Sequence, residues 1–250
     1  MSTEEPSRKL SQSLPEFLFR SAEGLSVDAE VLTDVPVHIF SAEMQTYIEK
    51  KWETFLTAHP ELFDGPLLRV LSASKTPTGI RLSTTSDITY KQVIGVRSRG
   101  SEDAVPEESF QVVSMILIPR TIDGVFILRE RTSGDWEHSL ELPGGFIKPA
   151  EVLALDGNLN AIAQRIAAKE VQEGTFYPES ISLLGALNYT AINELMLVFD
   201  VPLNIEFAEY QSLCAEAHGV QAPNLALSGA IPLHIPTKVV LHAYLQHVVV

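Results

Sequence analysis

The second half of the chain alternates strand patterns with helix patterns, and this alternation constrains the fold more than any other feature. "FQVVSMILIP" and "GVFILRER" are apolar runs of strand length on either side of the turn sequence "RTIDG". A helical period follows over about residues 158 to 173, and strand patterns return in "ISLLGALNY" and "ELMLVFDVP". Helices are also expected at about 205 to 218, ended by Gly219, and within 237 to 247. Strands that alternate with helices are typical of an α/β sandwich.

The first hundred residues predict a smaller unit that precedes this sandwich. Residues 1–27 are polar and lack a sustained period, so they predict a flexible tail. Apolar residues then recur at helical spacing behind Ser41, and "LLRVLSAS", "KTPTG" and "IRLSTTS" predict a β-hairpin. The segment 97–109, "RSRGSEDAVPEES", has the composition of a linker. We therefore expect an α+β module with its linker over 28–105 and the sandwich over 106–250.

Charge and composition limit the classes of function. The chain has 250 residues, 45% of them hydrophobic and 20% charged, which is enough for one large or two small packed domains. Its net charge of −14 opposes a nucleic-acid backbone, whose phosphates are bound chiefly by Lys and Arg, so we expect no nucleic-acid partner. A small anionic ligand is compatible with this charge, because a local arginine cluster acts within a screening length of about 8–10 Å.

Cysteine content and the N-terminal sequence bear on the compartment. The single cysteine, Cys214, allows no internal disulfide and no Cys-rich metal site, which favours a reducing environment. The N-terminus lacks the basic start and apolar run of a secretory signal, and no stretch reaches the roughly 20 apolar residues of a membrane span. We expect a cytoplasmic protein without a membrane partner. Nothing in the sequence indicates an oligomeric state.

Two glutamates extend the apolar stripe of the helix expected over 158 to 173. On a helical wheel of 100° per residue with Leu159 at 0°, Glu170 lies at about 20° and Glu173 at about 320°. A pair on a merely solvated face would lie opposite the apolar stripe. Carboxylates at i and i+3 on one face suit Mg²⁺ or Mn²⁺, which prefer hard oxygen ligands together with waters and substrate phosphates. The alternative is a last helical turn in solvent, in which Lys169 pairs with Glu173.

A glycine segment upstream adds a second motif. In "ELPGGFIKPAE", Glu151 follows Gly145 after five intervening residues, and "AAKEVQEGTF" lies at the end of the expected helix. The two segments together resemble the signature of the Nudix hydrolase superfamily, G-x5-E-x7-R-E-U-x-E-E-x-G-U, where U is a bulky aliphatic residue. In this resemblance Lys169 stands for the arginine, Glu170 for the next glutamate, Val171 for U and Glu173 for the first of the paired glutamates.

The sequence departs from that signature at three points. Seventeen residues separate Glu151 from Lys169 where the signature has seven, and Phe176 occupies the position of the final glycine. The longer loop costs little closure entropy, under about 1 kcal/mol for a doubling of length. Gly174 replaces the second paired glutamate, commonly a metal ligand in the family. Either other carboxylates meet that loss, as expected here, or the site is inactive.

The N-terminal half narrows the resemblance. "IEKKWETFLTAHPELFDGPLLRV" and "SDITYKQVIGVR" are similar to the segment before the Nudix domain in the branch that contains the UDP-glucose diphosphatase. The resemblance implies a Nudix-type α/β/α sandwich with a mixed sheet behind a small α+β module. It also implies Mg²⁺-dependent hydrolysis of a nucleoside diphosphate linked to another moiety, such as a UDP-sugar cleaved to UMP and a sugar 1-phosphate. The alternatives are ADP-ribose or a dinucleotide as substrate, and an inactive fold that binds a nucleotide or a protein.

The resemblance also implies roles for individual residues. The expected catalytic residues are Glu170 and Glu173, and the expected ligands of Mg²⁺ or Mn²⁺ are Glu170, Glu173, Glu151 and Glu194. A bound metal ion lowers the pKa of its water and neutralises a diphosphate. The residues expected beside the substrate are Arg129, Arg131, Gly144, Gly145 and Lys148, the arginines through bidentate hydrogen bonds to phosphate. For Arg129 and Lys148, the alternative is a role as an ordinary surface cation.

Overall fold

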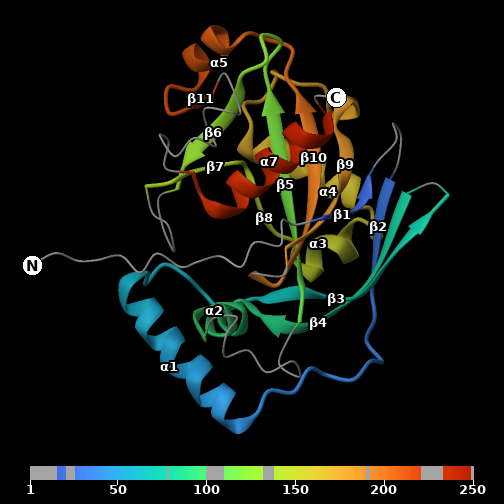
Figure 1. The fold of residues 1–250 in the computed structure, drawn as a ribbon, viewed down its shortest axis with the longest axis vertical. Helices are drawn as coiled ribbons and strands as arrows, with labels where there is room; N and C mark the ends of the chain where they lie inside the picture. The colour runs from blue at the N-terminus through green and yellow to red at the C-terminus, as the bar shows by residue number, and fades with distance from the viewer. Residues whose placement is uncertain are drawn as a thin grey trace, which may run out of the picture.

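The computed structural model describes residues 16–20, 26–77, 79–99, 110–131, 138–189, 192–220 and 233–248 (Figure 1). The strands are β1 (Glu16–Arg20), β2 (Ser26–Val31), β3 (Pro66–Thr76), β4 (Gly79–Thr89), β5 (Val112–Arg120), β6 (Phe126–Glu130), β7 (Leu140–Glu141), β8 (Gly144–Phe146), β9 (Ser182–Tyr189), β10 (Glu194–Pro202) and β11 (His218–Val220). The helices are α1 (Ala42–Ala58), α2 (Tyr90–Arg99), α3 (Pro149–Ala154), α4 (Leu159–Glu170), α5 (Phe207–Leu213) and α7 (Ile235–Val248), with a 3-10 turn η2 (Pro178–Ser180).

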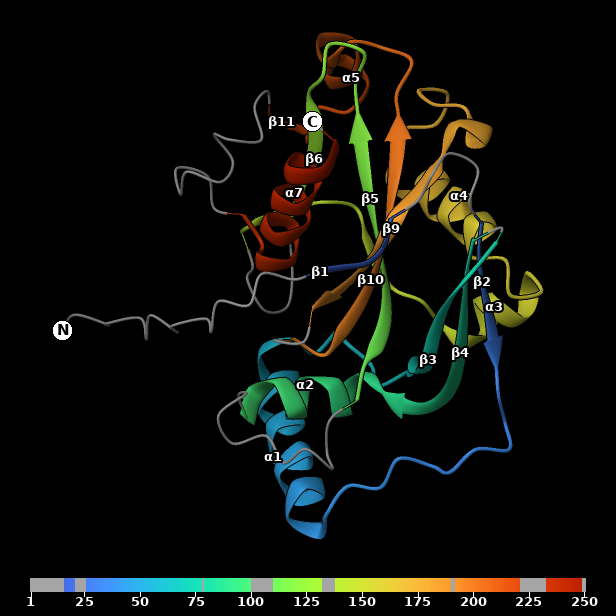
Figure 2. The ribbon, with the colours of Figure 1, turned by 45° about the vertical axis from the view of Figure 1, so that its right-hand side comes forward.

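The described strands form a mixed sheet whose main path runs β1-β9-β10-β5-β3-β4-β2. β5 lies parallel to β10 and β2 lies parallel to β4, whereas the remaining strand pairs are antiparallel. Helices α3 and α4 cover one face of the sheet and α7 covers the other, while α1 and α2 lie at one end (Figure 2). The expected α/β sandwich with a mixed sheet is therefore confirmed.

Strand β5 shows how the sequence builds these layers. Successive side chains of a strand point to opposite faces, so one apolar run supplies two cores. Met115 and Leu117 pack in the cluster that contains Ile162 of α4, whereas Ile116 packs in the cluster that contains Val240 of α7. All these side chains are buried. This two-sided burial explains why the strand reads as a continuous apolar run rather than an alternating one.

Several local predictions are confirmed in the first half of the chain. Ser41 caps α1, and its Oγ accepts a hydrogen bond of 3.1 Å from the Met44 amide. β3 and β4 form the expected antiparallel hairpin. The predicted flexible tail is wrong for residues 16–20, which pair with β9, and for Ser26 and Val27 at the start of β2. The rest of that segment, residues 1–15 and 21–25, lies outside the described residues.

The expected separation into two units with their own cores is also wrong. β3 pairs with β5 through Arg69 and Val112, so strands from both sides of the expected linker share one sheet. Leu68 and Leu82 belong to the same buried cluster as Leu117. The linker composition misleads because local composition does not indicate the backbone pairing between β3 and β5, the strands on either side of the segment. Residues 97–99 of that segment belong to α2, and 100–109 lie outside the described residues.

Among the described residues, no helix is long and apolar enough to cross a lipid bilayer.

Candidate functional site

Two arginines hold one carboxylate on the β6–β7 ribbon. Arg129 and Glu141 are cross-strand partners in the register of these strands. The Arg129 Nε donates a hydrogen bond of 3.1 Å to Oε1 of Glu141, and Arg131 Nη1 donates one of 2.7 Å to Oε2. The Glu141 side chain is only 12% exposed. Both of its oxygens are therefore neutralised by guanidinium groups in a poorly hydrated position.

The last residue of α4 brings a second carboxylate to the same arginine. Glu170 Oε2 accepts a hydrogen bond from Arg129 Nη1, and Lys169 Nζ lies 3.1 Å from Oε1. The Glu170 side chain is 15% exposed, whereas that of Arg129 is 41% exposed. We call Arg129, Arg131, Glu141, Lys169 and Glu170 the arginine–glutamate cluster. Its two carboxylates share one guanidinium.

A neutral histidine lies beside the arginine–glutamate cluster. His234 Nδ1 is 3.9 Å from Glu141 Oε2, and the His234 backbone N–H donates to the carbonyl of Leu140, which fixes the start of α7 against β7. Burial, and then the charge of Arg131, lower the pKa of His234 to about 4, although Glu141 opposes them. The imidazole is therefore neutral at pH 7. Three cations and two carboxylates leave the cluster with an excess of positive charge in a chain of net charge −14.

The glycine segment lies along the central sheet, directly after Glu141. Gly144 and Gly145 of β8 pair with Ile116 and Met115 of β5. A Cβ atom at Gly144 would lie 2.1 Å from the Met115 carbonyl oxygen, so the pairing needs glycine there. At Gly145, a Cβ atom would meet nothing within 4 Å. Gly144 therefore has a structural role in the pairing of β8 with β5, and the expected place of both glycines beside a substrate stays a prediction.

Glu173 does not share a helix face with Glu170, and the prediction that it does is wrong. The helix ends at Glu170, because Val171 adopts extended angles of φ −111° and ψ 145°. Glu173 is exposed in the following turn, where Gly174 has φ +82°. The angular argument assumed three further helical residues, and it fails where the backbone leaves the helix.

Glu151 instead connects α3 to α4. Its Oε2 accepts a hydrogen bond of 3.1 Å from the Lys148 backbone N–H at the start of α3. Its Oε1 lies 2.8 Å from Arg165 Nη2 of α4. The Lys148 ammonium lies 5.8 Å from the centroid of the Phe63 ring. Within the described part of the chain, Lys148 makes no ion pair with the arginine–glutamate cluster.

Glu194 also has its own partners, at the junction of α2 with the sheet. It is 5% exposed, and its carboxylate accepts hydrogen bonds of 2.5 Å from Arg97 Nη2 and 2.9 Å from Ser114 Oγ. Burial, and then the Glu194 charge, raise the pKa of Tyr189. This buried ion pair joins the N-terminal elements to β5 and β10.

The expected four-carboxylate metal shell is not assembled. Among the residues that the structure describes, no three His, Cys, Asp or Glu side chains gather in a group able to hold a metal ion. A smaller donor set does fit Mg²⁺, which commonly uses one or two carboxylates together with substrate phosphates and water. Glu141 and Glu170 provide that pair, since each directs an oxygen to Arg129. Sequence reasoning missed Glu141, because its pairing with Arg129 depends on the register between β6 and β7.

Solved structures align with about half of the chain. The NUDIX domain of Shewanella oneidensis NrtR complexed with ADP ribose aligns with 59% of this chain and 95% of that chain, at a TM-score of 0.40 and 16% identity. The longer S. oneidensis NrtR chain aligns over 55% of this chain and 63% of its own, less than two thirds, at 0.40 and 17%. The C-terminal domain of mouse MUTYH, in complex with human PCNA, aligns over 54% and 88%, at 0.37 and 18%.

Sequence comparison gives no relative: no family model and no curated protein matches the chain. NrtR has also been solved with a 27mer DNA. The expected lack of a nucleic-acid partner stays a prediction for this chain.

Proposed function

We propose that the chain is a Nudix-type hydrolase that cleaves a nucleoside diphosphate linked to another moiety. The observation that carries the proposal is that Glu141 and Glu170, two poorly exposed carboxylates, share Arg129. The likeness of "GFIKPAE" and "KEVQE" to the Nudix signature supports it.

The arginine–glutamate cluster can bind such a substrate if its arginines exchange their carboxylate partners for the phosphates of the substrate. The planar guanidinium groups of Arg129 and Arg131 match phosphate oxygens in a bidentate manner. When they turn to a diphosphate, Glu141 loses both of its guanidinium partners and Glu170 keeps only Lys169. A carboxylate that loses its guanidinium partner in a poorly hydrated position is costly. Glu141 and Glu170 would then hold Mg²⁺, which when bound supplies charge neutralisation and a more acidic water.

The substrate that we propose is a UDP-sugar. Water adds to one phosphorus, the bridging P–O bond breaks, and the products are UMP and a sugar 1-phosphate. One carboxylate of the cluster accepts the proton of the attacking water. The choice of a UDP-sugar rests on the sequence resemblance of the segment that forms α1, β3 and α2, and ADP-ribose and dinucleotides belong in the same assay.

Turnover of a panel of nucleoside diphosphate compounds tests the proposal. UDP-glucose, ADP-ribose and a dinucleotide are incubated with Mg²⁺ or Mn²⁺, and phosphate is measured after coupling to a phosphatase. We expect metal-dependent release from at least one compound, and a loss of at least about 10–100-fold in Glu170→Gln. Glu179→Gln, an exposed residue of η2, is the matched control and should keep its activity. Absence of release from every compound with both metals contradicts hydrolysis.

One observation favours a second function, a nucleotide-binding module without catalysis. In the described structure the oxygens of Glu141 and Glu170 are all occupied by Arg129, Arg131 and Lys169, so their charges are already compensated. If the arginines exchange partners while Glu170 stays paired with Lys169, binding occurs without turnover. Calorimetric binding of UDP by a protein that releases no phosphate would identify this function.

A further inference from the structure

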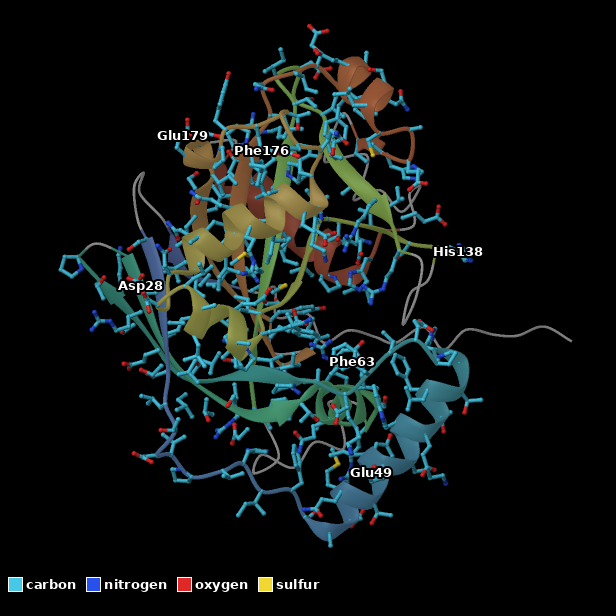
Figure 3. The ribbon with its side chains drawn as sticks, turned by 180° about the vertical axis from the view of Figure 1, so that it is seen from behind. Asp28, Glu49, Phe63, His138, Phe176 and Glu179 are labelled. Carbon is cyan, nitrogen blue, oxygen red and sulfur yellow. The ribbon has the colours of Figure 1, made fainter. Side chains whose placement is uncertain are left out.

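We infer that Phe63 and Lys148 hold the nucleobase of the ligand, an inference that rests on the proposed function. Phe63 is 71% exposed, although a large aromatic side chain gains much by burial. The Lys148 ammonium lies 5.8 Å from the centroid of its ring. The two residues are far apart in the sequence and meet beside the glycine segment, where Figure 3 shows Phe63 on the side of the N-terminal elements that faces the rest of the molecule.

The backbone around Phe63 is held in place. The Leu62 N–H donates to the carbonyl of His59 at 3.2 Å, and Asp64 Oδ1 accepts a hydrogen bond of 2.8 Å from the Lys91 N–H. The next carbonyl, that of Gly65, accepts from the Tyr90 N–H at 2.9 Å. A segment fixed at both sides loses little conformational entropy when a ligand binds, so it suits a stacking platform.

One side of the Phe63 ring rests on a glycine. A Cβ atom at Gly65 would lie 3.1 Å from Cε2 of the ring, so the lack of a side chain there gives the ring room to lie close to the backbone. With one side supported and 71% of the residue exposed, the ring has an accessible surface. An aromatic surface accepts any base, because every base has a π-face.

A chain of contacts links Lys148 to the helix that ends at Glu170. Lys148 follows Gly145 by three residues, and its backbone N–H binds Glu151, whose other oxygen binds Arg165 of α4. Arg165 precedes Glu170 by five residues, about 7.5 Å along a helix. In this inference the diphosphate of the nucleotide binds Arg129 and its base binds Phe63. The Lys148 ammonium is then available to a carbonyl of the base or to the ribose.

Calorimetric titration with two probes, UDP and inorganic pyrophosphate, each with Mg²⁺, tests this inference. Pyrophosphate has no base and reports on the arginine–glutamate cluster alone. We expect Phe63→Ala to weaken UDP binding by about 5- to 150-fold, the loss typical for an aromatic that stacks on a base, and to change pyrophosphate affinity less than about twofold. Phe63→Tyr keeps the ring and should restore UDP affinity.

Tyr177→Ala is the matched control, because Tyr177 is also an exposed aromatic, at 58%. Its neighbours Phe176 and Glu179 lie across α4 from Phe63 in Figure 3. Unchanged UDP affinity in Phe63→Ala, or an equal loss for both probes, overturns the inference and leaves the proposed function standing. A wild-type protein that binds neither probe overturns the proposed function as well.

Discussion

Arg129 neutralises two carboxylates that would otherwise repel each other. Glu141 and Glu170 both bind it, at side-chain exposures of 12% and 15%. Removal of one partner from a buried ion pair typically costs about 3–5 kcal/mol, and the 41% exposure of Arg129 reduces this expectation to about 1–2 kcal/mol. A lost arginine also leaves carboxylate oxygens available to another cation.

We therefore predict that Arg129→Ala lowers the melting temperature and that Mg²⁺ partly restores it. At about 2–4 °C per kcal/mol for a chain of this size, the decrease should be several degrees. The melting temperature of the wild type should respond less to Mg²⁺, because Arg129 already occupies the carboxylates. Differential scanning calorimetry over a range of Mg²⁺ concentrations measures both effects. An equal effect of Mg²⁺ on the melting temperatures of the two proteins would refute the claim that Arg129 neutralises both Glu141 and Glu170.

The lowered pKa of Asp87 makes the stability of the protein depend on pH. Burial raises the pKa of Asp87, but hydrogen bonds from Arg69 and the His38 backbone N–H, and the Arg69 charge, together lower it below 3.8. The stability that this carboxylate contributes is present above pH 3.8 and is lost as the pH falls through its folded-state pKa. We expect Asp87→Asn to cost about 1–3 kcal/mol at pH 7 and progressively less below pH 4, in urea unfolding. A difference between the proteins that stays constant from pH 7 to pH 3 would contradict this assignment.

At the scale of elements, the sequence predicts the types of helix and strand well and their ends poorly. The apolar run of β5 and the stripe of α4 are strong signals because burial against opposite faces determines both. The end of α4 is not encoded in that stripe. Glu173 continues the period, yet the backbone turns at Val171 and Gly174.

The candidate site was predictable only where its residues belong to one local pattern. Arg129, Arg131, Glu170 and the two glycines were expected beside a substrate or metal, and the structure brings the two arginines and Glu170 together. Glu141 depends on the β6–β7 register, and the partners of Glu194 depend on where α2 packs. Such long-range pairings are not visible in the local sequence.

The turn after α4 gives a prediction at this scale. Gly174 has φ +82°, and a Cβ atom there would meet nothing within 4 Å, so only the backbone angle resists a side chain. We expect Gly174→Ala to destabilise the protein by about 1 kcal/mol in urea unfolding. Glu173→Ala, at the exposed neighbouring position, should stay within about 0.5 kcal/mol of the wild type. A Gly174→Ala protein as stable as the wild type would show that the turn does not need glycine.

For the whole molecule, the shared sheet couples the two halves of the chain. β3 pairs with β5, and the buried pair of Arg97 with Glu194 joins α2 to β10. We therefore expect one cooperative unfolding transition. Hydrogen exchange followed by mass spectrometry should give the same denaturant midpoint for α1 and for β10. An α1 that loses protection at a distinctly lower denaturant concentration would indicate an N-terminal unit that folds on its own.

The most direct test of the proposed hydrolase compares turnover of UDP-glucose by the wild type, Glu141→Gln and Glu170→Gln in the presence of Mg²⁺. Products are identified by ³¹P NMR. If the arginine–glutamate cluster is the active site, the wild type should form UMP and glucose 1-phosphate. The activity of each variant should then be at least about 10–100-fold lower, with its fold intact by circular dichroism. A wild type that forms neither product, or a Glu141→Gln protein as active as the wild type, would contradict the site.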